Sequence, residues 1–296
     1  MDGLCQVLFA TVLLGAVSLS VVPTRWPYRV PCAALALWGA GVLGALAALL
    51  LGVFGFLTDP LLGGRHSIAL LPLDIAAIAG ATYAVAHVAV LYMRAGRRAR
   101  IRRDRHRSLL GMFGLPHPEH DVIVLPSNEA VAYSLPGPGG GHAVVSQALV
   151  DRLGPAELGA VLAHERAHLR QRHHLFVQLG EAARTALPGR RALARCAQRL
   201  GQLVEMRADC SARRHSCRHS LLRALERTVP AGSVPDALSA GHGALPLRRE
   251  HLLSRERCCR SVPASVVYSL AGVAVTSPMT ILSTGLLPAV CAWICV

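Results

Sequence analysis

Residues 155–168 read Pro-Ala-Glu-Leu-Gly-Ala-Val-Leu-Ala-His-Glu-Arg-Ala-His. The stretch follows a glycine, begins with proline in the first-turn position and carries an apolar face, and these features together predict an α-helix. Residues four apart share a face of a helix, so His164 and His168 would present two imidazoles to one metal ion. Glu165 stands beside the first of them, as in the His-Glu-x-x-His zinc motif, where this carboxylate is the general base. The alternative is a pair of exposed helical histidines.

A peptidase zinc site needs a third protein ligand. The segment Glu205-Met-Arg-Ala-Asp209 offers one, on a second long helix predicted over residues 190–214. Glu205 lies at the edge of the apolar stripe of that helix, where a carboxylate needs a partner because burial of an uncompensated charge is costly. Asp209 lies one turn further on and can accept a hydrogen bond from a zinc-bound imidazole. We therefore predict one Zn²⁺ bound by His164, His168 and Glu205, against the alternative of an ordinary charged helix face.

Three short segments before the motif helix have the composition of β-strands. They are residues 121–125, 130–134 and 142–146, and the turn-rich residues 136–141 connect the last two. We expect them to form a small antiparallel sheet inside a soluble domain over residues 108–262. A peptide substrate could add to this sheet as a further strand. The residues expected beside it are Asn128, Ala130, Ala132 and Ser134.

Peptide hydrolysis also needs a group that stabilises the negative oxygen formed on the attacked carbonyl. Tyr133 and His215 are the candidates that we place first. His173, His174 and Arg213 are further candidates, and each of the histidines could instead be a surface residue.

The composition points to a membrane. Hydrophobic residues make up 52% of the 296 residues, yet the formal net charge is +14, a combination typical of membrane spans with basic flanks. Apolar runs cover residues 3–22, 30–57 and 68–93, each near or above the roughly 20 residues that cross a bilayer. We expect three transmembrane helices within residues 1–93. A fourth apolar run, residues 263–296, is expected to form a C-terminal span, either as one helix or as a hairpin.

The arginines predict the orientation of these spans. A dense basic segment, residues 94–107, follows the third run, and basic residues beside a span remain on the cytoplasmic side. Counting the spans puts Arg25, Arg29 and the basic residues 248–260 on that same side, so we expect the domain over residues 108–262 to face the cytoplasm. These clusters adjoin the spans and carry no interleaved aromatic residues, which favours lipid headgroups over nucleic acid. Direct nucleic-acid binding is therefore not expected.

Two residue types narrow the possible chemistry. All 31 basic residues are Arg, which excludes the P-loop and the Ser-x-x-Lys nucleophile because both need Lys. The nine Cys include no Cys-x-x-Cys pair, so neither a cysteine-based zinc site nor a disulfide framework is predicted.

The His-Glu-x-x-His helix followed by Glu-x-x-Ala-Asp resembles the gluzincin membrane peptidases. More specifically, the chain is similar to the BlaR/MecR-type antirepressor family of integral membrane zinc metallopeptidases. Residues 133–137 (Tyr-Ser-Leu-Pro-Gly) and 144–146 (Val-Val-Ser) precede the motif helix as in that family, and two histidines at 173–174 follow it. The resemblance is strongest over residues 121–214. It implies a cytoplasm-facing zinc site among membrane helices, with a winged-helix repressor as a possible substrate.

The sensor members of that family carry a penicillin-binding domain beyond the last span. Its Ser-x-x-Lys site cannot be built without Lys, so direct β-lactam sensing is not expected here. We expect an α-helical multi-span membrane protein with an inserted α+β zincin-like metallopeptidase domain. Its expected function is that of a zinc-dependent endopeptidase acting on a protein. The alternatives are a membrane-protein quality-control metallopeptidase and a catalytically silent membrane signal transducer.

Overall fold

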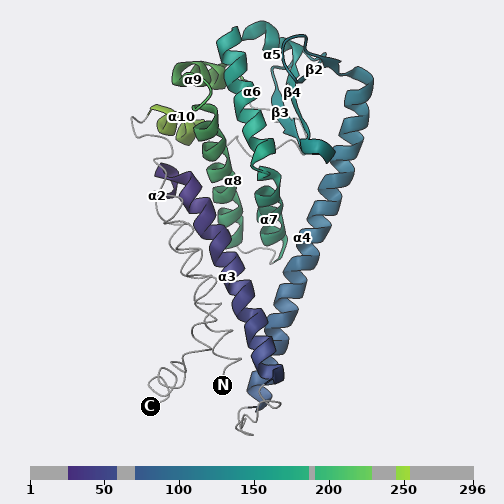
Figure 1. The fold of residues 1–296 in the computed structure, drawn as a ribbon, viewed down its shortest axis with the longest axis vertical. Helices are drawn as coiled ribbons and strands as arrows, with labels where there is room; N and C mark the ends of the chain where they lie inside the picture. The colour runs from purple at the N-terminus through teal and green to yellow at the C-terminus, as the bar shows by residue number, and fades with distance from the viewer. Residues whose placement is uncertain (1–25, 59–70, 187–190, 229–244, 254–296) are drawn as a thin grey trace. The chain divides into compact units, whose positions relative to one another are not determined.

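The computed structural model describes residues 26–58, 71–186, 191–228 and 245–253 (Figure 1). The expected spans over residues 3–22 and 263–296 lie outside the described residues. The chain divides into two compact units, of which the second comprises Tyr28–Pro31 and Leu91–Arg260. The described part is mostly helical with one small sheet, and all four strands belong to the second unit.

Two long helices contribute most of the described first unit. The short helix α2 (Trp26–Arg29) precedes α3 (Pro31–Thr58), which is rich in Ala and Leu, the strongest helix formers, and has proline at its first position. By length and composition, Pro31–Leu50 of α3 and Ile78–Phe113 of α4 are able to cross a membrane. Buried helices of soluble proteins share these two properties, so the helices support membrane insertion only weakly.

Helix α4 (Leu71–Phe113) continues through the basic segment without a break. Arginine is itself a good helix former, so the change from apolar to basic sequence does not end the helix. The helix ends at Gly114, whose N–H donates to the carbonyl of Leu110 at 2.7 Å. Within the second unit, Gln178 of α7 (His173–Ala186) donates to the Tyr92 carbonyl at 2.9 Å. Gly96 leaves room for this side chain, because an added Cβ would collide with it.

The sheet is mixed, and the expectation of an antiparallel sheet is wrong for one pair of strands. Its strands are β1 (Leu115–Pro116), β2 (Ile123–Leu125), β3 (Ala132–Leu135) and β4 (His142–Ser146), in the order β1-β2-β4-β3. The β3–β4 hairpin is antiparallel, but β4 inserts beside β2 in parallel. The returning strand of the hairpin, rather than its first strand, is the inner one. Strand β1 was not predicted, because two residues are too few to show a period of two.

The β3–β4 hairpin turns through consecutive glycines. Gly139, Gly140 and Gly141 have φ of +75°, +106° and +86°, values that glycine adopts readily because it lacks a Cβ. The turn leaves β3 at one edge of the sheet, with β4 on its inner side.

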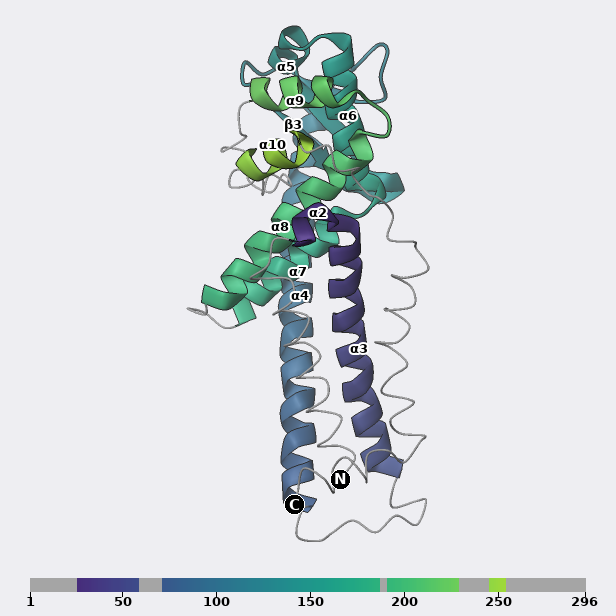
Figure 2. The same cartoon turned by 90° about the vertical axis from the view of Figure 1, so that its left-hand side faces the viewer.

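Helix α6 (Pro155–Arg170) is at the centre of the second unit, and it forms where the sequence predicted a helix. One side packs on the sheet in a core that includes Val145, Leu149, Val161 and Leu162. Helices α9 (Arg218–Arg227) and α10 (Leu245–Leu253) lie on the other side of α6 (Figures 1 and 2). Leu252 of α10 joins a second core there with Ala160.

The helix α8 (Arg191–Ala212) also forms where it was predicted, and it packs against both α6 and α7. Helices α7, α9 and α10 were not predicted, and neither was the short α5 (Gln147–Arg152), which the Ser146 hydroxyl caps by accepting from the Leu149 N–H.

At the start of α6 the Glu157 carboxylate accepts from Arg223 at 2.8 Å and from Arg227 at 2.7 Å, which ties α6 to α9.

Leu162 tests whether the α6–sheet core stabilises the second unit. Its side chain is 1% exposed, so Leu162→Ala should lower the free energy of unfolding by about 2–5 kcal/mol through lost burial and a residual cavity. Leu115→Ala is the control, because Leu115 is 62% exposed and its truncation should change stability by no more than about 0.5 kcal/mol. Denaturant unfolding in detergent micelles measures both, and equal effects would contradict the assigned core.

Candidate metal centre

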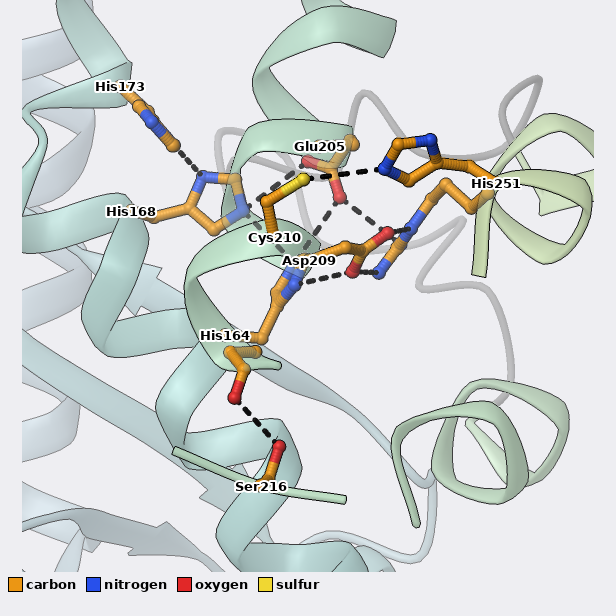
Figure 3. Close-up of polar contacts among 10 residues, drawn as sticks. His164, His168, His173, Glu205, Asp209, Cys210, Ser216 and His251 are labelled. Carbon is orange, nitrogen blue, oxygen red and sulfur yellow. Dashed lines mark hydrogen bonds and ion pairs between the residues drawn. The ribbon is translucent and has the colours of Figure 1, made fainter. Parts of the chain in front are cut away.

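Helices α6 and α8 bring together the two histidines of the motif and Glu205 (Figure 3). The Nε2 atoms of His164 and His168 lie 3.1 Å apart. The two carboxylate oxygens of Glu205 lie 3.4 Å from His164 Nε2 and 3.5 Å from His168 Nε2. All three side chains are buried, and one potential ligand atom from each lies within 4.8 Å of the others.

This donor set fits a zinc ion. Two imidazole nitrogens and a carboxylate are the three protein ligands of a common class of catalytic zinc site, which keeps one position open. Here the two Nε2 atoms and the carboxylate oxygens of Glu205 face one another in a buried space, an arrangement that a cation satisfies and that an apolar interior does not. His164, His168 and Glu205 can therefore hold a metal ion.

Asp209 and Arg248 surround this group. The Nδ1 atom of His164 lies 2.9 Å from a carboxylate oxygen of Asp209, so each ring nitrogen of this histidine faces a carboxylate. The guanidinium of Arg248, on α10, donates to both oxygens of Asp209 at 2.8 Å and 2.7 Å. It also lies 3.1 Å from Glu205. One cation thus compensates two buried anions.

Sequence reasoning did not predict the contacts of Arg248 with this group. Arg248 was counted with the basic residues 248–260 beside the last expected span, but its side chain is only 11% exposed and pairs with Asp209 and Glu205. No local pattern distinguishes it from the adjacent Arg249, whose side chain is 62% exposed. Its partner Asp209 is 39 residues away in sequence, beyond the reach of helical periodicity.

The charges around the group determine which side chains carry protons. Burial alone would raise the pKa of Asp209, but Arg248 and His164 outweigh it and hold that pKa well below its usual range. Burial and Arg248 both oppose protonation of His164, but its hydrogen bond to Asp209 and the charge of Asp209 outweigh them and raise its pKa to about 10. Burial lowers the pKa of His168 to about 4. Without a metal, His164 therefore carries the proton that an incoming cation must displace.

Glu165 is buried on α6 beside the group. Burial is the main cause that raises its pKa to about 7, and Glu205 adds to the increase while His164 opposes it. A carboxylate that titrates near neutral pH can both accept and release a proton, as a general base must.

The two first candidates for stabilising the transition state have other partners. Tyr133 is buried on β3 in a cluster with Leu110, Leu135 and Val144. Its hydroxyl hydrogen-bonds His106 of α4, and burial raises its pKa to about 12. His215 is exposed beyond the end of α8, where its Nδ1 lies 3.1 Å from the Ser211 carbonyl. Among the described residues, no contact joins Tyr133 or His215 to the two histidines and Glu205.

Of the further candidates for stabilising the transition state, only His173 contacts one of the two motif histidines among the described residues. His174 is half-buried on α7, and Arg213 follows α8. His173 is fully buried and touches the ring of His168 from the side away from Glu205 (Figure 3). Burial, with nearby cationic groups, lowers its pKa to about 2, so its imidazole is neutral.

The expected substrate strand coincides in part with β3. Ala132 and Ser134 belong to β3 and pair with Val145 and Ala143 of β4. Ala130 is buried just before the strand, and Asn128 is exposed in the preceding loop.

The motif helix thus lies beside a short sheet, and the candidate metal ligands come from two helices. Residues 96–226 match the model of Peptidase family M48, a zinc-dependent family. The match includes His164, Glu165, His168 and Glu205, and it supports an M48 metallopeptidase. It does not extend to Arg248. Neither a curated protein nor a solved structure matches the chain.

Metal affinity should depend on pH, because His164 must lose its proton to bind. Its pKa is raised to about 10, so below that pH each bound ion displaces a proton. The apparent zinc affinity should therefore rise about tenfold per pH unit between pH 6 and pH 8. Competition with a chromophoric chelator at several pH values measures this. An affinity independent of pH would contradict a protonated His164.

Arg248→Met tests whether the Arg248 guanidinium compensates the buried charges of Glu205 and Asp209. The change leaves Glu205 and Asp209 buried without their cation, which should cost about 3–5 kcal/mol in the metal-free protein. Zinc should reduce the loss, since it restores positive charge beside both carboxylates. The control is Arg249→Met, whose exposed pair with Glu226 should contribute no more than about 1 kcal/mol. Melting temperatures with and without zinc compare the two variants, and equal losses with and without zinc would count against this compensation.

Proposed function

We propose that this chain is a membrane-embedded, zinc-dependent endopeptidase that cleaves a protein substrate on the cytoplasmic side. The observation that carries the proposal is the buried convergence of His164, His168 and Glu205 from two helices, with Glu165 adjacent. The match of residues 96–226 to a zinc-dependent peptidase family supports the same activity.

The three ligand side chains would hold Zn²⁺, which when bound supplies Lewis acidity to a peptide carbonyl and to water. Glu165 would accept a proton from the attacking water at its carboxylate and pass it to the nitrogen of the leaving amine. Its pKa of about 7 suits both half-steps. Asp209 would hold the His164 ring in place through Nδ1, and Arg248 holds Asp209 in turn.

The edge strand β3 supports a mode of substrate binding. Strand β3 pairs with β4 on one side, and no other strand pairs with it in the described part of the chain. It also packs near the motif helix α6. A substrate in extended conformation would extend the sheet along residues 128–134, with backbone hydrogen bonds that do not depend on its sequence.

Three observations support the membrane location. Helices α3 and α4 contain segments long and apolar enough to span a bilayer. Large apolar side chains are exposed on them, including Leu43, Leu50 and Phe54 on α3, a feature that soluble helices avoid. The basic residues 94–107 follow the apolar part of α4 in the same helix, as expected of a cytoplasmic flank.

The substrate is proposed from the sequence resemblance over residues 121–214. A transcriptional repressor of the winged-helix class is our first candidate, because that resemblance is to antirepressor peptidases. A damaged membrane protein is the alternative, since quality-control peptidases use the same zinc chemistry.

Two substitutions separate metal binding from catalysis. Glu165→Gln should retain stoichiometric zinc but lower the cleavage rate about 10²–10⁴-fold, because the general base is lost. Glu205→Ala should lose stoichiometric zinc as well as cleavage, because only two protein ligands remain. The measurements are metal content of the purified protein and hydrolysis of an unfolded protein substrate. Glu181→Ala is the control, because this exposed carboxylate pairs with Arg184 on the surface of α7.

The outcomes distinguish the alternatives. Wild-type protein that binds zinc and cleaves no substrate would indicate a catalytically silent transducer. Wild-type protein without stoichiometric zinc would end the metallopeptidase proposal, and so would a Glu165→Gln variant as active as the wild type.

A further inference from the structure

The second histidine of the motif contacts another buried histidine. The Nδ1 atoms of His168 and His173 lie 3.1 Å apart, and the rings are nearly perpendicular, at 89°. Both residues are almost completely buried, at 1% and 0% exposed. Two imidazole nitrogens form a hydrogen bond only when one carries the proton and the other offers its lone pair. The direction of this bond therefore has a definite consequence for His168.

Which of the two histidines donates follows from a chain of hydrogen bonds that ends at Arg207. Arg207 of α8 has only donors, and its Nε–H donates to the side-chain oxygen of Gln171. The same oxygen lies 3.2 Å from Nε2 of His173, so that nitrogen must be the donor. A neutral His173 with its proton on Nε2 offers the lone pair of Nδ1 to His168.

His168 must then donate from its own Nδ1. Its other nitrogen, Nε2, is left with the lone pair, and Nε2 is the atom that faces His164 and Glu205. The tautomer that a metal ligand needs thus follows from Arg207, without reference to the metal.

The backbone that joins α6 to α7 is bent to bring this histidine into place. Arg172, in the two-residue link before His173, has φ of +50° and is the one non-glycine residue with positive φ among the described residues. An L-residue adopts this conformation at a cost, because its Cβ approaches the following carbonyl. The turn at Arg172 separates the two helices, and His173 at the start of α7 contacts His168. Gln171 of the same link contacts His173 and Arg207.

We propose that His173 is a positioning residue that fixes the tautomer and ring orientation of His168 for metal binding, through a relay from Gln171 and Arg207. The inference rests on the proposed zinc-dependent function. The two ligand imidazoles are then held differently, His164 by the carboxylate of Asp209 and His168 by a neutral imidazole.

A pair of substitutions at position 173 tests the relay. In His173→Asn the side-chain oxygen stands where Nδ1 stood, because both atoms are bonded to Cγ, so an acceptor for His168 is retained. His173→Phe keeps a buried ring and removes the acceptor. Zinc affinity should fall about 10–100-fold in His173→Phe, as for other lost partners of metal-ligating histidines, and should stay close to the wild-type value in His173→Asn. The neighbouring His174→Phe, outside the relay, is the matched control and should bind zinc like the wild type.

Cobalt substitution provides a readout independent of peptidase activity. The visible absorption of bound Co²⁺ reports ligand geometry, so His173→Phe should change the spectrum while His173→Asn and His174→Phe keep it. Wild-type affinity and spectrum in His173→Phe would overturn the inference but leave the metallopeptidase proposal intact. Equal losses in His173→Asn and His173→Phe would also overturn it, because packing rather than the acceptor would then matter.

A wild-type protein that binds no zinc would instead overturn the proposed function, and this inference with it. Gln171→Leu is the second variant if His173→Phe fails to fold. It breaks the relay one step further from the metal, and weaker zinc binding is expected. Wild-type affinity in Gln171→Leu would contradict the relay.

Discussion

The candidate metal centre depends on one electrostatic constraint, the burial of two carboxylates on a single face of α8. Glu205 and Asp209 are almost fully excluded from water; Glu205 faces both imidazoles of α6, and Asp209 faces that of His164. Neither could remain ionised there alone, since the desolvation of a carboxylate costs several kcal/mol. Arg248 and the imidazoles of α6 supply the compensating charge and hydrogen bonds. The same two anions therefore contact both α6 and α10, and Glu205 belongs to the group that could hold a cation.

Helix α6 connects this polar group to the rest of the second unit. Its apolar face packs on the sheet, and the motif residues lie on its other, polar face. Each candidate ligand imidazole then has a separate partner on its second nitrogen, Asp209 for His164 and His173 for His168. The rings are fixed by groups that do not themselves bind the metal, which is how protein sites keep ligand geometry before the ion arrives.

The parts of the site that follow from the spacing of residues within one helix could be predicted from the sequence. The parts that depend on contacts between distant residues could not. The helical spacing of His164 and His168 and the apolar stripe around Glu205 are local patterns, and helices form at both places. The parallel pairing of β2 with β4 depends on which strand of a hairpin is the inner one, which no local pattern encodes. Arg248 looks like any other arginine near an apolar run, and only the tertiary structure reveals its partners.

The location of Arg248 on α10 affects how a fragment that carries the candidate metal centre should be delimited. The stretch that resembles known peptidases ends at residue 226, while α10 begins at Leu245. A fragment trimmed to the recognisable stretch would keep His164, His168 and Glu205 and discard the guanidinium that pairs with Glu205 and Asp209. Such a fragment would carry surplus negative charge in its interior, because Glu205 and Asp209 would lose the guanidinium that pairs with them. The charge partner of the buried carboxylates therefore lies beyond the part of the chain that matches the peptidase family.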